Sequence, residues 1–228
     1  MQQVSNEISE NQGQLIEKVR NRNLTYLDYS ALVDLSKTVI SIENQQLNGV
    51  FVEAGCALGG STLIIASVKK TTRPFYVYDT FGMIPPPSQQ DDEDIHQRYE
   101  TIVSGKSVGI SGEKYYGYED NLLNKVKETF IEFNIPPEEN EMHFVRGTYE
   151  KSLILNDPVA FAHIDCDWYE SVKVCLERIE PKLVSGGVFI IDDYYTWSGC
   201  SKAVDSYFRN RSDEFNFVNK SRLHIIKK

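Results

Sequence analysis

The chain has 228 residues, of which 41% are hydrophobic and 11% are aromatic, and its formal net charge at pH 7 is −9. This length and composition fit one α/β domain with a substantial core. The negative charge argues against nucleic acid or an anionic membrane surface as the main partner, because both would repel the chain.

The cysteines and the N-terminus bear on the compartment. Four cysteines form no CxxC pair and lie in predicted core segments: Cys56, Cys166, Cys175 and Cys200. Buried thiols of this kind are typical of a reduced protein, so we expect a cytoplasmic location. No apolar run is long enough to span a bilayer, and the polar N-terminus lacks the apolar core of a signal peptide.

The first predicted elements are helical. Residues 1–12 are expected to form a loose tail, followed by helices over residues 15–19 and 28–43. In the second helix, apolar residues recur at helical spacing and define a buried face: Leu32, Leu35, Val39 and Ile42. We therefore interpret residues 1–22 as a tail and the start of a helical cap, and residues 23–228 as a single domain.

A glycine-rich turn follows the first predicted strand, over residues 50–53. It reads Gly55-Cys-Ala-Leu-Gly59-Gly60-Ser61 and opens a helix that runs to about residue 69. Glycines let the backbone approach a ligand closely, and a helix N-terminus offers free amides. The turn matches neither the Walker pattern nor a strict GxGxxG, and tight packing alone would also explain it.

The next predicted strand, residues 75–78, makes a ligand more plausible than packing alone. It ends in Asp79, an acid that can bind ribose hydroxyls, as in dinucleotide folds. Glu53 before the turn and Asp79 after this strand together indicate a nucleoside pocket that lacks the phosphate-binding lysine of the Walker pattern.

Residues 82–119 form a long insertion with few helix or strand signals. The segment holds three consecutive prolines, an acidic run and four tyrosines: Tyr99, Tyr115, Tyr116 and Tyr118. Insertions of this length are usually lids or disordered loops, and we favour a lid because the tyrosines can line a site. After it, Asp120 is expected to cap a helix, and residues 142–145 are expected to form a strand with residues 146–149 as its exit loop.

Two acidic pairs mark the centre of the chain. A buried strand over residues 161–164 ends in Asp165 and Asp167, and after a helix a second strand ends in Asp192 and Asp193. Such a β-α-β unit is parallel, and ligands bind outside the carboxyl ends of its strands. The crowded carboxylates predict a hard divalent ion, Mg²⁺, Ca²⁺ or Mn²⁺, rather than zinc. One pair alone would be better explained by helix caps and turns, but two pairs at successive strand ends favour a site.

The rest of the chain predicts a helix over residues 201–209 and a closing hairpin of residues 215–218 and 223–226. The four histidines are scattered without ligand spacing, so we expect structural roles for them: His96, His143, His163 and His224.

At the acidic pairs the chain resembles a known family. The segments HIDCDWYESVK, GGVFIIDDYYTWSGCSKAVDSYF, VEAGCALGGST and YDTFGMIPPP are similar to those of the macrocin O-methyltransferases, and the similarity runs over residues 23–228. The resemblance implies a Rossmann-like class I methyltransferase fold, with a mostly parallel seven-stranded sheet, helices on both faces and a C-terminal antiparallel hairpin. It also implies S-adenosylmethionine as cofactor, Mg²⁺ or another hard divalent cation, and a small-molecule hydroxyl acceptor, a sugar or a phenol. A homo-oligomer is compatible with it.

The resemblance also implies roles for individual residues. Asp165, Asp192 and Asp193 would hold the metal, and Asp167 would be the general base. The residues that it places around the cofactor are Glu53, Ala54, Gly55, Gly59, Ser61, Asp79, Gly147, Thr148, Tyr149 and Asp165. Two other functions fit the residues alone: a cofactor-binding scaffold or regulator without catalysis, and a dinucleotide-dependent oxidoreductase, which the imperfect glycine pattern disfavours.

Overall fold

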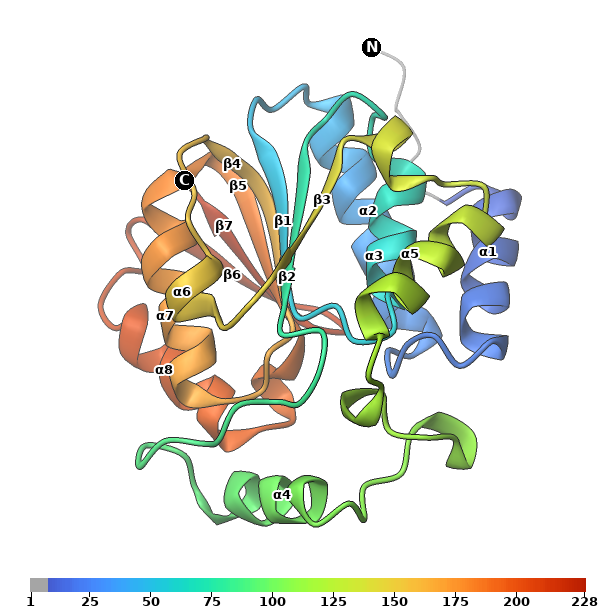
Figure 1. Cartoon of the computed structure of the whole chain (residues 1–228). Coiled ribbons are helices and arrows are strands. Elements are labelled where there is room, and N and C mark those ends of the chain that lie inside the picture. Colours follow the sequence, from blue (N-terminus) through green and yellow to red (C-terminus); the bar gives the residue numbers. More distant parts are fainter. Residues whose placement is uncertain (1–7) are drawn as a thin grey trace.

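The computed structural model describes residues 8–228, which form a seven-stranded sheet with helices on both faces (Figure 1). The sheet order is β3-β2-β1-β4-β5-β7-β6, and β7 is antiparallel to both of its neighbours. The strands are β1 (Val50–Ala54), β2 (Phe75–Asp79), β3 (Met142–Arg146), β4 (Val159–Ile164), β5 (Leu183–Ile191), β6 (Phe215–Asn219) and β7 (Leu223–Lys227). The expected mostly parallel sheet with a C-terminal antiparallel hairpin is confirmed.

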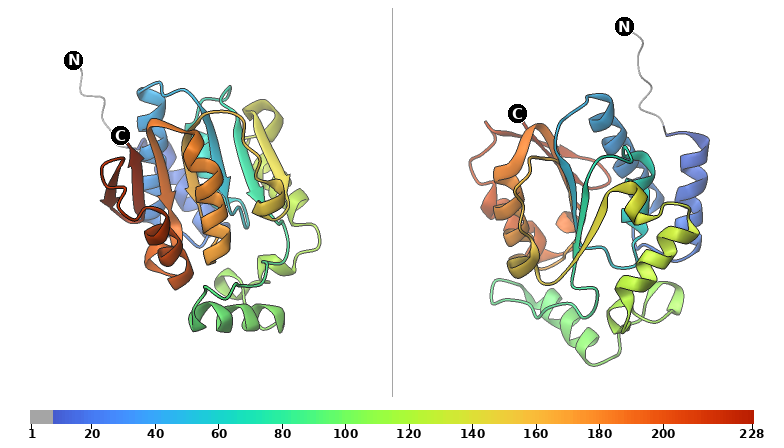
Figure 2. Two further views of the ribbon diagram at one scale, coloured as in Figure 1. Left: turned by 90° about the vertical axis from the view of Figure 1, so that its left-hand side faces the viewer. Right: turned by 45° about the horizontal axis from the view of Figure 1, so that its top comes forward.

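Helices surround this sheet, most of them in two layers. They are α1 (Glu10–Asn21), α2 (Tyr29–Asn44), α3 (Gly60–Val68), α4 (Glu93–Val103), α5 (Leu122–Glu132), α6 (Tyr149–Ser152), α7 (Tyr169–Ile179) and α8 (Ser198–Tyr207). Figure 1 shows α1, α2, α3 and α5 on one side of the sheet and α6, α7 and α8 on the other. In both views of Figure 2, α4 stands apart from these layers, beyond the carboxyl ends of the central strands.

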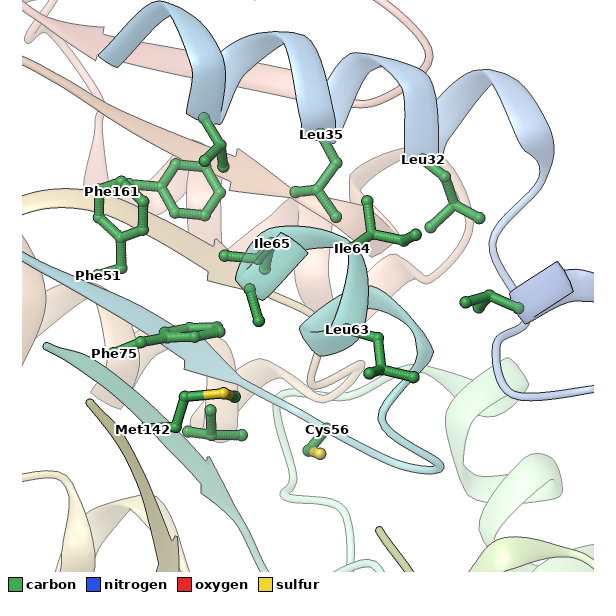
Figure 3. Close-up of a cluster of buried hydrophobic side chains, with 14 of the residues drawn as sticks. Leu32, Leu35, Phe51, Cys56, Leu63, Ile64, Ile65, Phe75, Met142 and Phe161 are labelled. Carbon is green, nitrogen blue, oxygen red and sulfur yellow. The ribbon is translucent and has the colours of Figure 1, made fainter. Parts of the chain in front are cut away.

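Alternation along the strands fills both layers. On one face Phe51 and Phe161 pack edge to face, with ring centroids 5.3 Å apart, and meet Leu35 of α2 and Ile65 of α3 (Figure 3). On the other face Val52 packs toward α7 and α8. Full burial of each such side chain contributes roughly 1.5–3 kcal/mol. Because alternate side chains point to opposite faces, the sheet is buried between two hydrophobic cores. The edge formed by the carboxyl ends of its strands is covered by neither core.

Several predicted boundaries differ from the structure. Helix α1 begins at Glu10, within the segment predicted to be a tail, because the hydroxyl of Ser9 accepts a hydrogen bond from the Gln12 amide and caps it. Asn21 ends that helix, and residues 1–7 of the predicted tail lie outside the described residues. The sequence predicted the strand before Asp192 to cover residues 188–191. Strand β5 begins five residues earlier, at Leu183, because Leu183 pairs with Val159 of β4.

Two predictions near the insertion are wrong. The residue that precedes α5 is Asn121 rather than Asp120. The insertion itself contains the eleven-residue helix α4, which starts with two acids in its first turn, where the helix dipole favours negative charge. Ile95 and Ile102 bury its inner face, although the segment was expected to be a poor helix.

The structure also bears on membranes. Among the helices formed by residues 8–228, none combines the length and the apolar character needed to cross a bilayer.

Candidate active site

A cavity of about 330 Å³ opens at the carboxyl edge of the sheet. The glycine turn after β1 lines it, together with the ends of β2, β4 and β5, residues 24–27 and parts of the lid segment, which we define as residues 82–119. The predicted site residues that line it are Gly55, Ser61, Asp79, Tyr149, Asp165, Asp167, Asp192 and Asp193. The cavity lining does not include the other predicted cofactor residues, Glu53, Ala54, Gly59, Gly147 and Thr148.

The glycine turn is built for close approach. Gly55 has φ of +100°, and a Cβ placed on it would lie 1.6 Å from the carbonyl oxygen of Asp165. The amide of Gly60 donates a hydrogen bond to the carbonyl of Leu24, and a Cβ there would lie 2.4 Å from the same oxygen. The turn therefore requires glycine at both positions, and it brings β1, β4 and residues 24–27 to one side of the cavity.

Asp79 holds this turn from β2. Its carboxylate accepts hydrogen bonds from the amides of Cys56 at 2.7 Å, Ala57 at 3.0 Å and Phe81 at 2.6 Å. Burial raises the pKa of Asp79, and the three amides partly offset that effect. The residue therefore orders the turn as well as facing the cavity.

Glu53 lies behind the turn rather than in it. Its fully buried carboxylate lies 2.9 Å from Nδ1 of His163, its neighbour on β4, and accepts a hydrogen bond from the hydroxyl of Thr62. Burial alone would lower the pKa of His163, but the carboxylates of Asp192 and Glu53 outweigh it and raise the pKa to about 9. His163 therefore supplies a buried positive charge between the turn and the acidic cluster.

The acidic cluster joins two strand ends. Carboxylate oxygens of Asp165, Asp192 and Asp193 all lie within 4.8 Å of one another. Asp167 follows in a left-handed conformation, with φ of 55°, and its amide donates a hydrogen bond to the carboxylate of Asp193 at 3.2 Å. The four aspartates therefore meet at one edge of the cavity, as the strand-end pattern predicted.

Charge is unevenly compensated within the cluster. Asp192 pairs with Nε of Arg222 at 2.6 Å and lies 3.9 Å from Nε2 of His163. Burial would raise the pKa of Asp192, but these two cations outweigh it and lower the pKa. The pKa values of Asp165 and Asp193 are raised well above their usual range, first by burial and then by neighbouring carboxylates.

This arrangement fits a divalent metal ion. The half-buried carboxylate of Asp165 and the buried one of Asp193 repel each other and their neighbours, and in residues 8–228 neither forms an ion pair. An ion bound by three carboxylate oxygens would offset that repulsion, and a set of hard oxygen donors suits Mg²⁺ or a similar cation.

The lid segment covers the cavity and is attached by its acidic run. Asp91 accepts a hydrogen bond from the amide of Tyr169 at 2.7 Å, and Asp94 accepts one from the amide of Ser198 at 3.2 Å. These amides open α7 and α8, the two helices that follow the acidic strand ends. The acidic run thus caps two helix N-termini that lie far from it in sequence, where negative charge is favoured.

Two of the four lid tyrosines, Tyr115 and Tyr116, line the cavity as expected. Tyr118 instead donates its hydroxyl to the carbonyl of Ile102 and holds the lid segment together. Above the cavity, Trp168 donates its indole N–H to the carbonyl of Pro85 at 3.0 Å.

The attachment predicts the effect of one added methyl group. A Cβ at Gly199 would lie 2.2 Å from Oδ1 of Asp91, 2.6 Å from Cδ1 of Ile95 and 2.9 Å from the backbone nitrogen of Tyr169. Gly199→Ala should therefore displace α4 and disturb its attachment to the start of α7, while α8 stays helical because Ala is the better helix former. Loss of the charge-assisted hydrogen bonds should speed amide exchange in residues 82–103 by about tenfold or more, as measured by mass spectrometry.

Ser206→Ala at an exposed position of the same helix is the matched control for Gly199→Ala and should exchange like the parent. Equal exchange in both variants would show that contact with α8 does not hold the lid segment. In the parent, we expect residues 82–119 to exchange more slowly with ligands bound.

Sequence reasoning missed several residues of the cavity. Arg222 precedes β7, and Tyr26 lies in the segment before α2, where no pattern indicated a site. Arg98 lies in the insertion of residues 82–119, where no motif pointed to it. His163 lies outside the cavity lining but left a signal, because an ionisable residue within a fully buried strand needs a partner.

The sheet order is that of the class I methyltransferase fold, and the glycine turn and the acid at the end of β2 line its cavity. A family model described as Macrocin-O-methyltransferase (TylF) matches residues 22–217, and the chain belongs to this family of O-methyltransferases. This confirms the family that the sequence motifs resembled.

Curated relatives and solved structures agree with that assignment. The chain is 25% identical over 204 residues to the demethyldecarbamoylnovobiocin O-methyltransferase of Streptomyces niveus, covering 84% of this chain and 72% of the relative. It is also 25% identical over 193 residues to the 8-demethyl-8-(2,3-dimethoxy-alpha-L-rhamnosyl)-tetracenomycin-C 4'-O-methyltransferase of Streptomyces olivaceus, covering 80% and 67%.

Among solved structures, the O-methyltransferase NovP has the same fold, with a TM-score of 0.72 and 22% identity over 93% of this chain and 87% of NovP. The calicheamicin methyltransferase CalS11 has a TM-score of 0.61 and 14% identity over 99% and 97% of the two chains.

Proposed function

We propose that this methyltransferase needs a divalent metal ion, and that it transfers the methyl group to a hydroxyl of a sugar or phenol in a small natural product. The observation that carries the proposal is the cluster of Asp165, Asp192 and Asp193 at the rim of the cavity that the glycine turn also lines. Cofactor subsite and metal ligands thus share one enclosed space.

The names of the two curated relatives support the proposed kind of acceptor. One is the O-methyltransferase of demethyldecarbamoylnovobiocin, and the other is a 4'-O-methyltransferase of a rhamnosyl tetracenomycin. Both names describe O-methylation of a small molecule, and the second includes a sugar. We infer the same general class of acceptor for this chain.

Methyl transfer to a hydroxyl requires alignment and a deprotonated oxygen. Asp165, Asp192 and Asp193 would hold the ion, which when bound lowers the pKa of an acceptor hydroxyl. Arg222 and His163 fix the carboxylate of Asp192 from behind, so the ligand set is oriented before the ion binds. The lid segment closes over the acceptor and excludes water.

Asp167 would take the proton. It lines the cavity two residues after Asp165, and its backbone is anchored to the carboxylate of Asp193. The glycine turn and Asp79 would hold S-adenosylmethionine with its methyl group toward the acceptor oxygen. Holding the two reactants in line can supply roughly 7–11 kcal/mol of the barrier.

Titration calorimetry tests the cofactor subsite. The parent should bind S-adenosylmethionine and not NAD. Asp79→Ala should weaken that binding by about 1–3 kcal/mol, roughly 5- to 150-fold, because the amides of Cys56 and Ala57 in the turn lose their acceptor. Asp157→Ala, which removes an exposed acid, is the control.

An unchanged dissociation constant in Asp79→Ala would remove Asp79 from the cofactor subsite. Preference for NAD would favour an oxidoreductase instead. A scaffold without catalysis would bind S-adenosylmethionine yet give no methyl gain in any hydroxyl acceptor screened by mass spectrometry with Mg²⁺.

A further inference from the structure

We propose that Arg98 of α4 makes this enzyme selective for acceptors that carry an anionic group, a carboxylate or a phosphate, which its guanidinium binds inside the cavity. The inference rests on the proposed O-methyl transfer and adds the chemical class of its acceptor.

Arg98 faces inward because of its place on α4. It lies three residues after Ile95 and four before Ile102, and residues at this spacing share one face of a helix. Both isoleucines are buried, and Arg98 itself is half-buried and lines the cavity. Asp91 and Asp94 attach the start of this helix to α7 and α8, so the position of Arg98 is set by the closed lid segment.

The hydrogen-bonding capacity of Arg98 is not used by the chain. Its guanidinium carbon lies 5.4 Å from the ring centroid of Tyr115. A cation–π contact of this kind uses no oxygen acceptor, and a guanidinium carries five N–H donors. Within residues 8–228 the guanidinium forms no hydrogen bond and has no carboxylate within 4 Å. Its donors are therefore available to an anionic ligand that enters the cavity.

The other arginine that lines the cavity shows the contrast. Nε of Arg222 lies 2.6 Å from Asp192 and its Nη1 lies 3.6 Å from Asp28, so this guanidinium has two carboxylate partners. Arg222 therefore serves the metal cluster. Of the two arginines that line the cavity, Arg98 is the one that has no carboxylate partner within residues 8–228.

The surroundings of Arg98 place it on the acceptor side of the cavity. Arg98 lies over the ring of Tyr115, and both residues line the cavity together with Asp167, the proposed base. The glycine turn and Asp79 form the cofactor subsite. A planar guanidinium binds carboxylate and phosphate in a bidentate manner, which would orient an anionic acceptor with its hydroxyl toward Asp167.

Pairs of one anionic and one neutral probe test the inference. The pairs are 3,4-dihydroxybenzoate with its methyl ester, and rhamnose 1-phosphate with methyl rhamnoside, titrated with S-adenosylhomocysteine and Mg²⁺ present. In at least one pair the parent should bind the anion roughly 10- to 100-fold more tightly, the scale of a charge-assisted hydrogen-bonded pair. Arg98→Gln should reduce that preference to about twofold or less, and Arg98→Lys should retain part of it, because a lysine keeps the charge without the fork.

Arg209→Gln removes the same charge from an exposed position outside the cavity and should keep the full preference. The affinity for S-adenosylhomocysteine should be equal in the parent and in Arg98→Gln. The inference is wrong if the parent prefers the anion in neither pair, or if Arg98→Gln keeps the preference. It is also wrong if Arg98→Gln instead loses S-adenosylhomocysteine, since Arg98 would then bind the carboxylate of the cofactor. Metal-dependent methyl gain that persists in Arg98→Gln would leave the proposed function intact in each case.

Discussion

Removal of divalent metal with EDTA is expected to abolish methyl transfer, and added Mg²⁺ should restore it. Asp193→Asn should reduce turnover by roughly 10³-fold or more, because a bound ion supplies several kcal/mol of stabilisation to the developing oxyanion. Binding of S-adenosylmethionine should change little, since the glycine turn and Asp79 lie at other strand ends. The measurement is methyl gain in an acceptor screen followed by mass spectrometry, with calorimetry for the cofactor.

The same variant has an expected effect on stability that separates a metal ligand from a structural acid. In metal-free protein the carboxylate of Asp193 is repelled by Asp167, Asp165 and Asp192. Asp193→Asn should therefore be at least as stable as the parent to thermal unfolding without metal, and Mg²⁺ should stabilise only the parent. Asp213→Asn, at an exposed position, should behave like the parent in every assay. Full turnover in metal-free parent protein would contradict the metal requirement.

Replacement of Asp167 by Asn should cost about 10²–10⁴ in turnover, the usual contribution of a general base, while metal and cofactor still bind nearly as in the parent. The substitution keeps the size of the side chain and removes its ability to accept a proton. Its backbone hydrogen bond to Asp193 does not depend on the side chain, so the local fold should persist.

Asp165→Asn is the matched comparison, two residues away in the same cavity. It should lose metal affinity first, and excess Mg²⁺ should partly restore its rate. Metal titrations and pH–rate profiles of both variants with an accepted substrate distinguish the two roles. If excess Mg²⁺ rescues Asp167→Asn and not Asp165→Asn, the assignment of base and ligand is reversed.

The meeting of the strand-end aspartates could be predicted from local sequence patterns. Continuous apolar runs predicted β4 and the end of β5, and the topology of parallel strands then required their carboxyl ends to lie at one edge. The meeting of Asp165, Asp192 and Asp193 followed from the sequence for that reason. The glycine turn followed in the same way, since Gly55 has a conformation and a close contact that other residues would not tolerate.

Residues that enter the cavity from distant segments left no such pattern. Arg222 reaches Asp192 only because β7 pairs with β5 in antiparallel register. The acidic run was predicted only as part of a lid, with no contacts of its own, yet Asp91 and Asp94 cap α7 and α8, whose first amides lie about 80 and 100 residues further along the chain.

Glu53 is a predicted cofactor residue whose position also depends on pairing between distant strands. As the acid before the glycine turn, it was expected to border the cofactor, but it lies beside His163 because the register of β1 and β4 makes them neighbours. By itself, the sequence determined the fold class, the family and the strand ends that carry the acids, because these depend on periodicity and local motifs. Only the tertiary structure decided which charges are paired and which stay free, because pairing depends on contacts between segments that are far apart in the chain.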